Sequence, residues 1–110
     1  MNNSHLYGSV NEYWFAHNEE RRFLANVAGS KDLGLWVAEQ IGLPAETAHD
    51  YAANEYVGKV FLLREEEPVS RMARDLAAKG VAFVEEELHA LMAAVMTAAH
   101  RRHCEPRSAA

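Results

Sequence analysis

The chain has 110 residues, of which 49% are hydrophobic and 25% charged, as is usual for one soluble globular domain. Its net charge of −5 is uneven: residues 1–99 carry 8 basic against 15 acidic side chains, and residues 100–110 carry 3 against 1. This acidity argues against nucleic acid as a partner, because binding phosphates needs a basic surface. No stretch has the roughly 18–20 apolar residues of a membrane span, and no signal peptide is recognisable. We therefore expect a cytoplasmic protein without direct membrane insertion. Cys104 is the only cysteine, which excludes an internal disulfide.

The first helical segment is predicted over residues 11–41. Phe15 and Phe23 are eight residues apart, about two helical turns, so we expect both on one inward face as core anchors. Gly29 is a candidate for a kink or interruption, since glycine in a helix costs about 1 kcal/mol relative to alanine. Gly42 is predicted to end the segment.

A second helix is predicted over residues 44–63, and a third begins at Pro68. The glutamates at 65–67 precede this third helix, where acidic charge and proline both favour a helix start. Gly80 is predicted to cap its end. The apolar stripes consist of Ala48, Ala52, Tyr56 and Val60 in the second helix, and Val69, Met72 and Leu76 in the third.

A fourth helix is predicted from the glutamates at 85–87 to about His100, after which the sequence turns polar and is expected to fray. No run alternates between apolar and polar residues as a strand does. Short connections between four amphipathic helices predict an all-α, four-helix antiparallel bundle. The apolar positions of the fourth helix are Leu88, Leu91, Met92, Val95 and Met96.

Candidate metal ligands and catalytic motifs are weak. His100, His103 and Cys104 form the only close cluster of soft ligands, but a zinc site needs three or four rigidly held groups and these lie in a fraying tail. Consecutive glutamates point about 100° apart on a helix and cannot converge on one cation. No phosphate loop, dinucleotide fingerprint or nucleophile elbow is present. We predict no metal, no cofactor and no enzymatic activity.

Gly34 and Trp36 suggest close packing inside the first helical segment. A glycine at position 34 would allow another helix or a large aromatic side chain to approach the backbone. Trp36 is predicted to lie in the core, the usual place for a large aromatic residue in a helical stripe.

Two motifs resemble those of a known family. FAHNEERRF at residues 15–23 and KDLGLWVAEQIGL at residues 31–43 are similar to the ATPase inhibitor zeta subunit of alphaproteobacterial F-type ATP synthases. Members typically read Phe-Ala-His-Asp-Glu-Glu and then Leu-Leu-Gly-Leu-Trp-Ala-Ala, and the similarity covers about residues 12–100. The matching residues are Phe15, Ala16, His17, Glu19 and Glu20 in the first motif, and Leu33, Gly34, Leu35 and Trp36 in the second.

The resemblance implies a four-helix bundle that inhibits ATP hydrolysis by binding the catalytic head subunits of the synthase. It further implies a mobile N-terminal arm at residues 1–11, a bundle domain at 12–100 and a disordered tail at 101–110. The arm becomes helical and enters the interface between head subunits, which is folding upon binding. The implied partner-binding residues are Glu12, Phe15, His17, Glu19 and Glu20; the structural motif comprises Phe23, Leu33, Gly34, Leu35 and Trp36.

The sequence departs from the family where the inhibitory arm lies. Inhibitory members carry a charged segment such as Phe-Asp-Asp-Arg-Glu before the first motif, whereas residues 4–8 here read Ser-His-Leu-Tyr-Gly. Asn18 replaces the aspartate of the motif, and Ala28-Gly29 replaces two arginines. An alternative reading is therefore a diverged paralogue without the inhibitory arm, acting as a small interaction module for an unknown partner.

Overall fold

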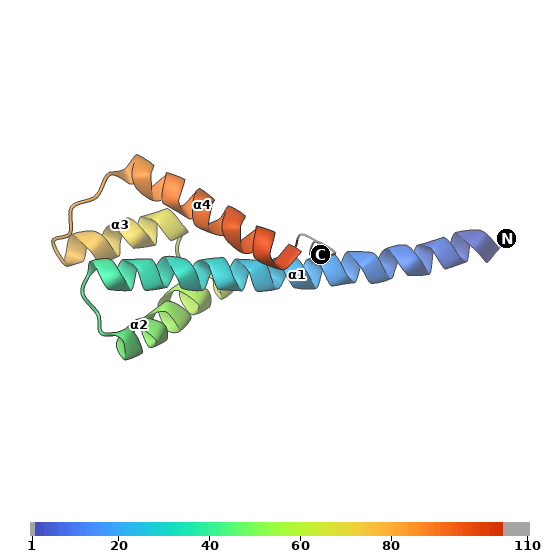
Figure 1. Cartoon of the computed structure of the whole chain (residues 1–110), viewed down its shortest axis with the longest axis horizontal. Helices are drawn as coiled ribbons and strands as arrows, with labels where there is room; N and C mark the ends of the chain where they lie inside the picture. Colours follow the sequence, from blue (N-terminus) through green and yellow to red (C-terminus); the bar gives the residue numbers. More distant parts are fainter. Residues whose placement is uncertain (1, 105–110) are drawn as a thin grey trace, which may run out of the picture.

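The computed structural model describes the backbone of residues 2–104 and the side chains of residues 18–104. All regular elements in this part of the chain are helical, which confirms the predicted all-α class. α2 continues directly into the π-helix η1, so there are four helical segments, and they form a bundle (Figure 1). The elements are α1 (Asn2–Gln40), α2 (Ala45–Tyr51), η1 (Ala52–Leu62), α3 (Pro68–Ala78) and α4 (Glu85–Cys104).

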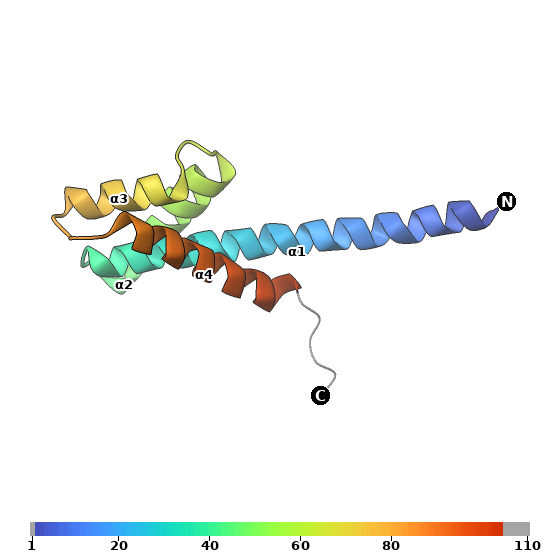
Figure 2. The ribbon, with the colours of Figure 1, turned by 90° about the horizontal axis from the view of Figure 1, so that it is seen from above.

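α1 is the longest element, and its N-terminal half projects beyond the other helices (Figures 1 and 2). It begins at Asn2 rather than near residue 11, and the molecule is 65 Å long. The predicted kink at Gly29 is wrong, because α1 continues through it. A Cβ at this position would lie 2.4 Å from Met96 Sδ, so the glycine lets α4 approach α1 closely.

Glycines end α1 and α3, as predicted. Gly42 has φ +81° and Gly80 has φ +72°, the left-handed conformation that glycine adopts at little cost. After Gly42, the Leu43 amide donates to Ala38 O at 2.9 Å. After Gly80, the Val81 amide donates in the same way to Leu76 O at 2.9 Å. Both bonds satisfy carbonyls that the helix end leaves without a partner.

The wide turns of η1 explain its four-residue spacing of apolar side chains. In an α-helix each step of four residues overshoots a full turn by about 40°, so such a stripe drifts around the helix. A π-helix bonds residue i to i+5 and has a wider turn, which reduces this drift. The predicted stripe is buried, and it consists of Ala48 of α2 and Ala52, Tyr56 and Val60 of η1.

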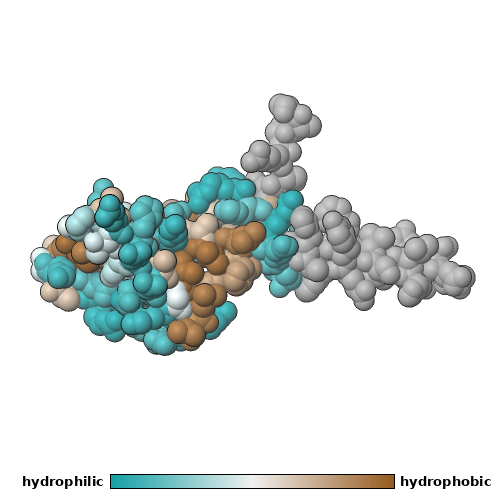
Figure 3. Space-filling view, turned by 90° about the horizontal axis from the view of Figure 1, so that it is seen from below, coloured by the Kyte–Doolittle hydropathy of each residue, from teal (hydrophilic) through white to brown (hydrophobic). Residues whose placement is uncertain are grey.

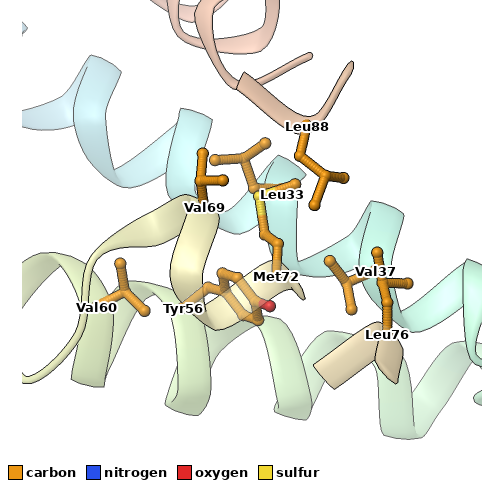
Figure 4. Packing of buried hydrophobic residues seen from close by; sticks show 8 residues of the cluster. All are labelled: Leu33, Val37, Tyr56, Val60, Val69, Met72, Leu76 and Leu88. Atoms are coloured by element: carbon orange, nitrogen blue, oxygen red, sulfur yellow. The ribbon is translucent and has the colours of Figure 1, made fainter. Parts of the chain in front are cut away.

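The hydrophobic core lies where the C-terminal half of α1 meets η1, α3 and α4. In Figure 4, Met72 lies between Leu33 of α1 and Tyr56 of η1, and all three side chains are almost fully buried. The predicted stripe of α3 is buried, while α4 contributes Leu88 and several half-buried side chains. The core residues are Leu33, Val37, Tyr56, Val60, Val69, Met72, Leu76 and Leu88.

α4 packs along α1 and reaches Cys104, four residues past the predicted end of the bundle. Its last turns are joined to α1 by polar contacts. His100 Nε2 donates to Asn26 Oδ1 at 2.8 Å, and Arg102 lies 3.0 Å from Asp32. The remainder of the predicted tail lies outside the described residues. None of the described helices is both long enough and apolar enough to cross a membrane.

Candidate functional site

The predicted partner-binding residues lie on the projecting half of α1. Because α1 is one continuous helix, the spacing of Glu12, Phe15 and Glu19 places these positions along one face. Glu20 falls on a neighbouring face, whereas His17, two residues from both Phe15 and Glu19, falls on the opposite side of the helix. The side chains of Glu12, Phe15 and His17 are outside those that the structure describes, so their contacts stay a prediction.

Glu19 and Glu20 are exposed to solvent, on the first turn whose side chains are described. Glu19 lies 3.6 Å from Arg22, and both side chains are more than half exposed. An exposed pair of this kind contributes little to folding, typically less than about 1 kcal/mol. These residues are therefore accessible to a partner, while their role in binding stays a prediction.

Phe23 is not the core anchor that the sequence predicted. Its side chain is 48% exposed and packs only from one side, against Phe61 of η1, with ring centroids 5.7 Å apart. The physical reason is that other helices cover this face of α1 only further along: Val27, one turn later, is half-buried, and Ser30, two turns later, is buried. Helical periodicity shows which residues share a face, but not where the covering helices stop.

Phe23 belongs to an exposed apolar surface that we call the junction patch, because it lies where α1 leaves the bundle. Figure 3 shows apolar side chains gathered in this part of the molecule. The run of three apolar residues at positions 61–63 was a signal for it, since consecutive helical residues cannot all face one core. The patch comprises Phe23 and Leu24 of α1 and Phe61, Leu62 and Leu63 at the end of η1.

The second motif is structural. Leu33 is buried in the core, and Leu35 is half-buried. A Cβ on Gly34 would lie 2.7 Å from Ala52 Cα and 3.1 Å from Tyr56 Cβ, so the predicted close approach of another helix is confirmed. Trp36 packs against the core but is only half-buried. This motif fixes α1 to η1.

A cluster of charges between η1 and α3 was not predicted from the sequence. At its centre Arg71 has a side chain only 7% exposed. Its guanidinium donates to Glu55 at 2.7 Å, to Asp75 at 2.8 Å and to Glu66 at 3.2 Å. One buried cation thus joins carboxylates from η1, from α3 and from the loop between them. The spacing of Arg71 and Asp75, four residues apart beside the buried Met72, was the available signal.

Two tyrosines complete this cluster. The hydroxyls of Tyr51 and Tyr56 donate to Asp75 Oδ2, the latter at 3.1 Å, and the two rings lie 5.6 Å apart. The Arg71 guanidinium lies 5.5 Å from the centre of the Tyr56 ring, a cation–π contact.

The environment perturbs the ionisation of these groups. Burial raises the pKa of Tyr51 and of Tyr56 well above the usual phenol value, and the nearby Asp75 carboxylate adds to both shifts. Hydrogen bonds from Arg71 hold the pKa of Glu55 below its usual value of 4.5, against the opposing effect of burial. Burial alone would lower the pKa of Arg71, but its hydrogen bonds to Glu55 and Asp75 raise it.

This cluster is complete in itself. Among the described side chains, no buried nitrogen or oxygen atom lacks a hydrogen-bond partner. The buried polar atoms of the cluster are therefore satisfied by one another. We interpret this cluster as a structural contact that holds α3 against η1.

Two of the residues considered above as metal ligands, His100 and Cys104, take part in protein contacts. His100 bonds Asn26 through Nε2, and Cys104 Sγ lies 3.9 Å from its Nδ1. Within the part of the chain that the structure describes, no group of three or more His, Cys, Asp or Glu residues could hold a metal ion.

Comparison with known protein families gives one finding. A family model described as ATPase inhibitor subunit zeta matches residues 8–102, which is most of the chain. Neither the curated proteins nor the solved structures provide a match.

Proposed function

The chain belongs to the ATPase inhibitor subunit zeta family, and from this premise we propose that it binds the catalytic head of F-type ATP synthase and restrains ATP hydrolysis. Inhibitor subunits act by binding, so we propose no catalytic role. The subunits of the head that it contacts, and its cytoplasmic location, are parts of the same proposal.

The shape of α1 is the observation that supports this proposal most. The helix is anchored in the bundle by Leu33 and by Gly34 against η1, while its N-terminal half projects free of the other helices (Figure 1). At a rise of about 1.5 Å per residue, the segment from Asn2 to Arg22 is about 30 Å long. A helix of this length can be inserted between two subunits of a partner while the bundle stays outside.

The residues proposed to contact the partner are those of the first motif. Glu12, Phe15 and Glu19 share a face of this helix, an arrangement suited to a helix-in-groove contact with one aromatic anchor flanked by charges. Glu20 extends the contact to the adjacent face, and His17, on the opposite side of the helix, would contact the second of the two subunits between which the helix is inserted. Affinity would come mainly from the apolar area that Phe15 buries.

The experiment is to add the purified protein to the ATP synthase catalytic head from its own source and to measure the rate of ATP hydrolysis. We expect saturable inhibition with a defined stoichiometry. A Phe15→Ala variant should inhibit at least about tenfold less well, as for an aromatic anchor at an interface. Absence of both binding and inhibition at a large molar excess would refute the proposal.

A second function is favoured by a specific observation. The family match starts at residue 8 and leaves out residues 1–7, and the charged segment of inhibitory members is replaced at residues 4–8. In this second function the chain has lost inhibition and has kept a bundle that serves as an interaction module. Grafting a family-type charged segment onto residues 4–8 discriminates the two: inhibition gained only with the graft supports this second function, and inhibition by the parent excludes it.

A further inference from the structure

No element among the described residues covers the junction patch. Leu24 is 48% exposed, Leu62 52% and Leu63 65%, and they accompany the tilted ring pair of Phe23 and Phe61. Exposed large apolar side chains are ordinary when scattered, but a contiguous group on a small monomer marks an interaction site. These residues come from α1 and η1, which are far apart in the sequence and adjacent in space, so the fold itself assembles the surface.

From this surface we infer that the junction patch is a second contact with the same catalytic head, which it meets through an apolar surface beside the point where α1 enters. The inference rests on the function proposed above. Phe23 lies one helical turn after Glu19, on the same unbroken helix as the proposed binding residues. A helix held rigidly in the bundle cannot be inserted to its full projecting length without bringing the patch against the partner.

A pocket beside the patch supports a partner with protruding side chains. It has a volume of about 290 Å³ and opens next to Phe61, between α1 and the end of η1. Its lining is apolar at Val60, Phe61 and Met96 and polar or charged on the other side, which suits one apolar side chain with a polar end. The polar and charged lining residues are Asn26, Ser30, Arg64, Glu66 and Glu67.

Two other occupants are disfavoured. The segment that follows α4 reads Glu-Pro-Arg-Ser-Ala-Ala and has no large apolar side chain with which to cover the patch. A second copy of the chain would bring together two bodies that each carry a net charge of −7 over residues 1–99, and this repulsion opposes association.

The test uses the full chain with two matched double variants. Leu62→Ser with Leu63→Ser removes half-exposed apolar groups from the patch. Phe83→Ser with Val84→Ser does the same in the connection between α3 and α4, at the end of the bundle away from the projecting half of α1 (Figure 1). The concentration for half-maximal inhibition of ATP hydrolysis and the dissociation constant for the catalytic head are measured for each, with thermal melts to show that both are folded.

We expect the patch variant to bind and inhibit at least about tenfold more weakly, with the control variant within about twofold of the parent. A parent that inhibits together with a patch variant that inhibits equally well overturns the inference and leaves the proposed function intact. A parent that neither binds nor inhibits overturns both. Sedimentation of each protein alone is a further check: self-association lost in the patch variant, with unchanged inhibition, would assign the patch to a second copy.

Discussion

Gly29 and Gly34 set how closely other helices approach α1. A Cβ at position 29 would meet the flexible end of Met96, which can move aside, whereas a Cβ at position 34 would meet the backbone of Ala52. Backbone cannot yield without shifting the whole of η1. A side chain at position 34 is therefore expected to disturb the packing more than one at position 29, although both are glycines within the same helix.

Replacing Gly34 by alanine should destabilise the protein. Alanine favours the helix by about 1 kcal/mol, but overpacking against Ala52 typically costs about 1–3 kcal/mol, so we expect a net loss or at best no gain. Gly58→Ala is the control, since its Cβ would make an ordinary contact of 3.5 Å with Ala53 O. Thermal melts followed by circular dichroism compare the two; a Gly34→Ala protein more stable than Gly58→Ala would contradict the close packing.

At the scale of elements, the junction of η1 and α3 depends on charges that only the fold brings together. Arg71 reaches Glu55, 16 residues away in sequence, and Tyr51 reaches Asp75 across 24 residues. A buried ion pair is costly to form, and it is still more costly to leave half-made. Burial of Arg71 therefore makes the position of α3 against η1 specific, since few other arrangements would satisfy its three carboxylates.

Truncating the central cation should be far more harmful than truncating its exposed neighbour. Arg71→Ala removes the buried cation that three partly buried carboxylates share, although each keeps a second partner: Lys59 for Glu55, Arg74 for Glu66 and the two tyrosines for Asp75. We expect a loss of about 1.5–3 kcal/mol in unfolding free energy, as for hydrogen bonds to charged groups. Arg74→Ala removes a 60% exposed side chain bonded to Glu66 and should cost less than about 1 kcal/mol. Urea denaturation of both variants measures these losses. Equal losses would show that the cluster does not hold α3 against η1.

The raised pKa of Tyr56 predicts a loss of stability in alkali. Above pH 10.0, the ordinary value, the unfolded chain releases the phenol proton while the folded chain retains it, so unfolding becomes easier as pH rises. The slope from this group approaches about 1.4 kcal/mol per pH unit. Tyr56→Phe should flatten the alkaline limb of the stability curve, and an unchanged slope would contradict the burial of the hydroxyl.

The lowered pKa of Glu55 predicts a loss of stability in acid. Its folded pKa is below the ordinary 4.5, so its contribution is present above that value and is lost as the pH falls through the folded pKa. The difference in unfolding free energy between the parent and Glu55→Gln should therefore be largest near neutrality and shrink in acid. Urea titrations at several pH values measure it; a constant difference would mean that Arg71 does not favour the carboxylate.

The local sequence pattern predicted most of the helices, but it did not predict which of their residues other helices cover. The stripe of Met72 and Leu76 and the stop at Gly80 depend on neighbours within a few residues, and they were predicted correctly. The exposure of Phe23 and the burial of Arg71 depend on where other helices end or reach, which no short window of sequence contains. For the same reason the family resemblance identified the motifs but not the junction patch.

At the scale of the whole molecule, the bundle and the projecting half of α1 are separable. Every buried side chain among the described residues lies between Ala25 and Ala99. The predicted arm at residues 1–11 lies in the part of α1 that projects beyond the other helices (Figure 1), and its mobility stays a prediction.

Deleting residues 1–11 should leave the melting temperature nearly unchanged. Changes away from a core typically alter the unfolding free energy by no more than about 0.5 kcal/mol. The same deletion should abolish inhibition of the catalytic head if the proposed function is correct. Melts and hydrolysis assays on one preparation provide both readouts. A large drop in melting temperature would show that the arm is part of the folding unit, against the predicted division of the chain.

The pairing of α1 with α4 has a consequence for how the protein is made. Asn26 and His100 are 74 residues apart, and Asp32 and Arg102 are 70 apart, so α1 leaves the ribosome well before the helix that covers it. Throughout synthesis the face of α1 around Gly29 stays open, and closing so long a loop slows folding relative to bundles of sequential neighbours. A nascent chain that stalls before Glu85 would present this face to chaperones and proteases, so cellular quality control can recognise an incomplete copy by the absence of α4 alone.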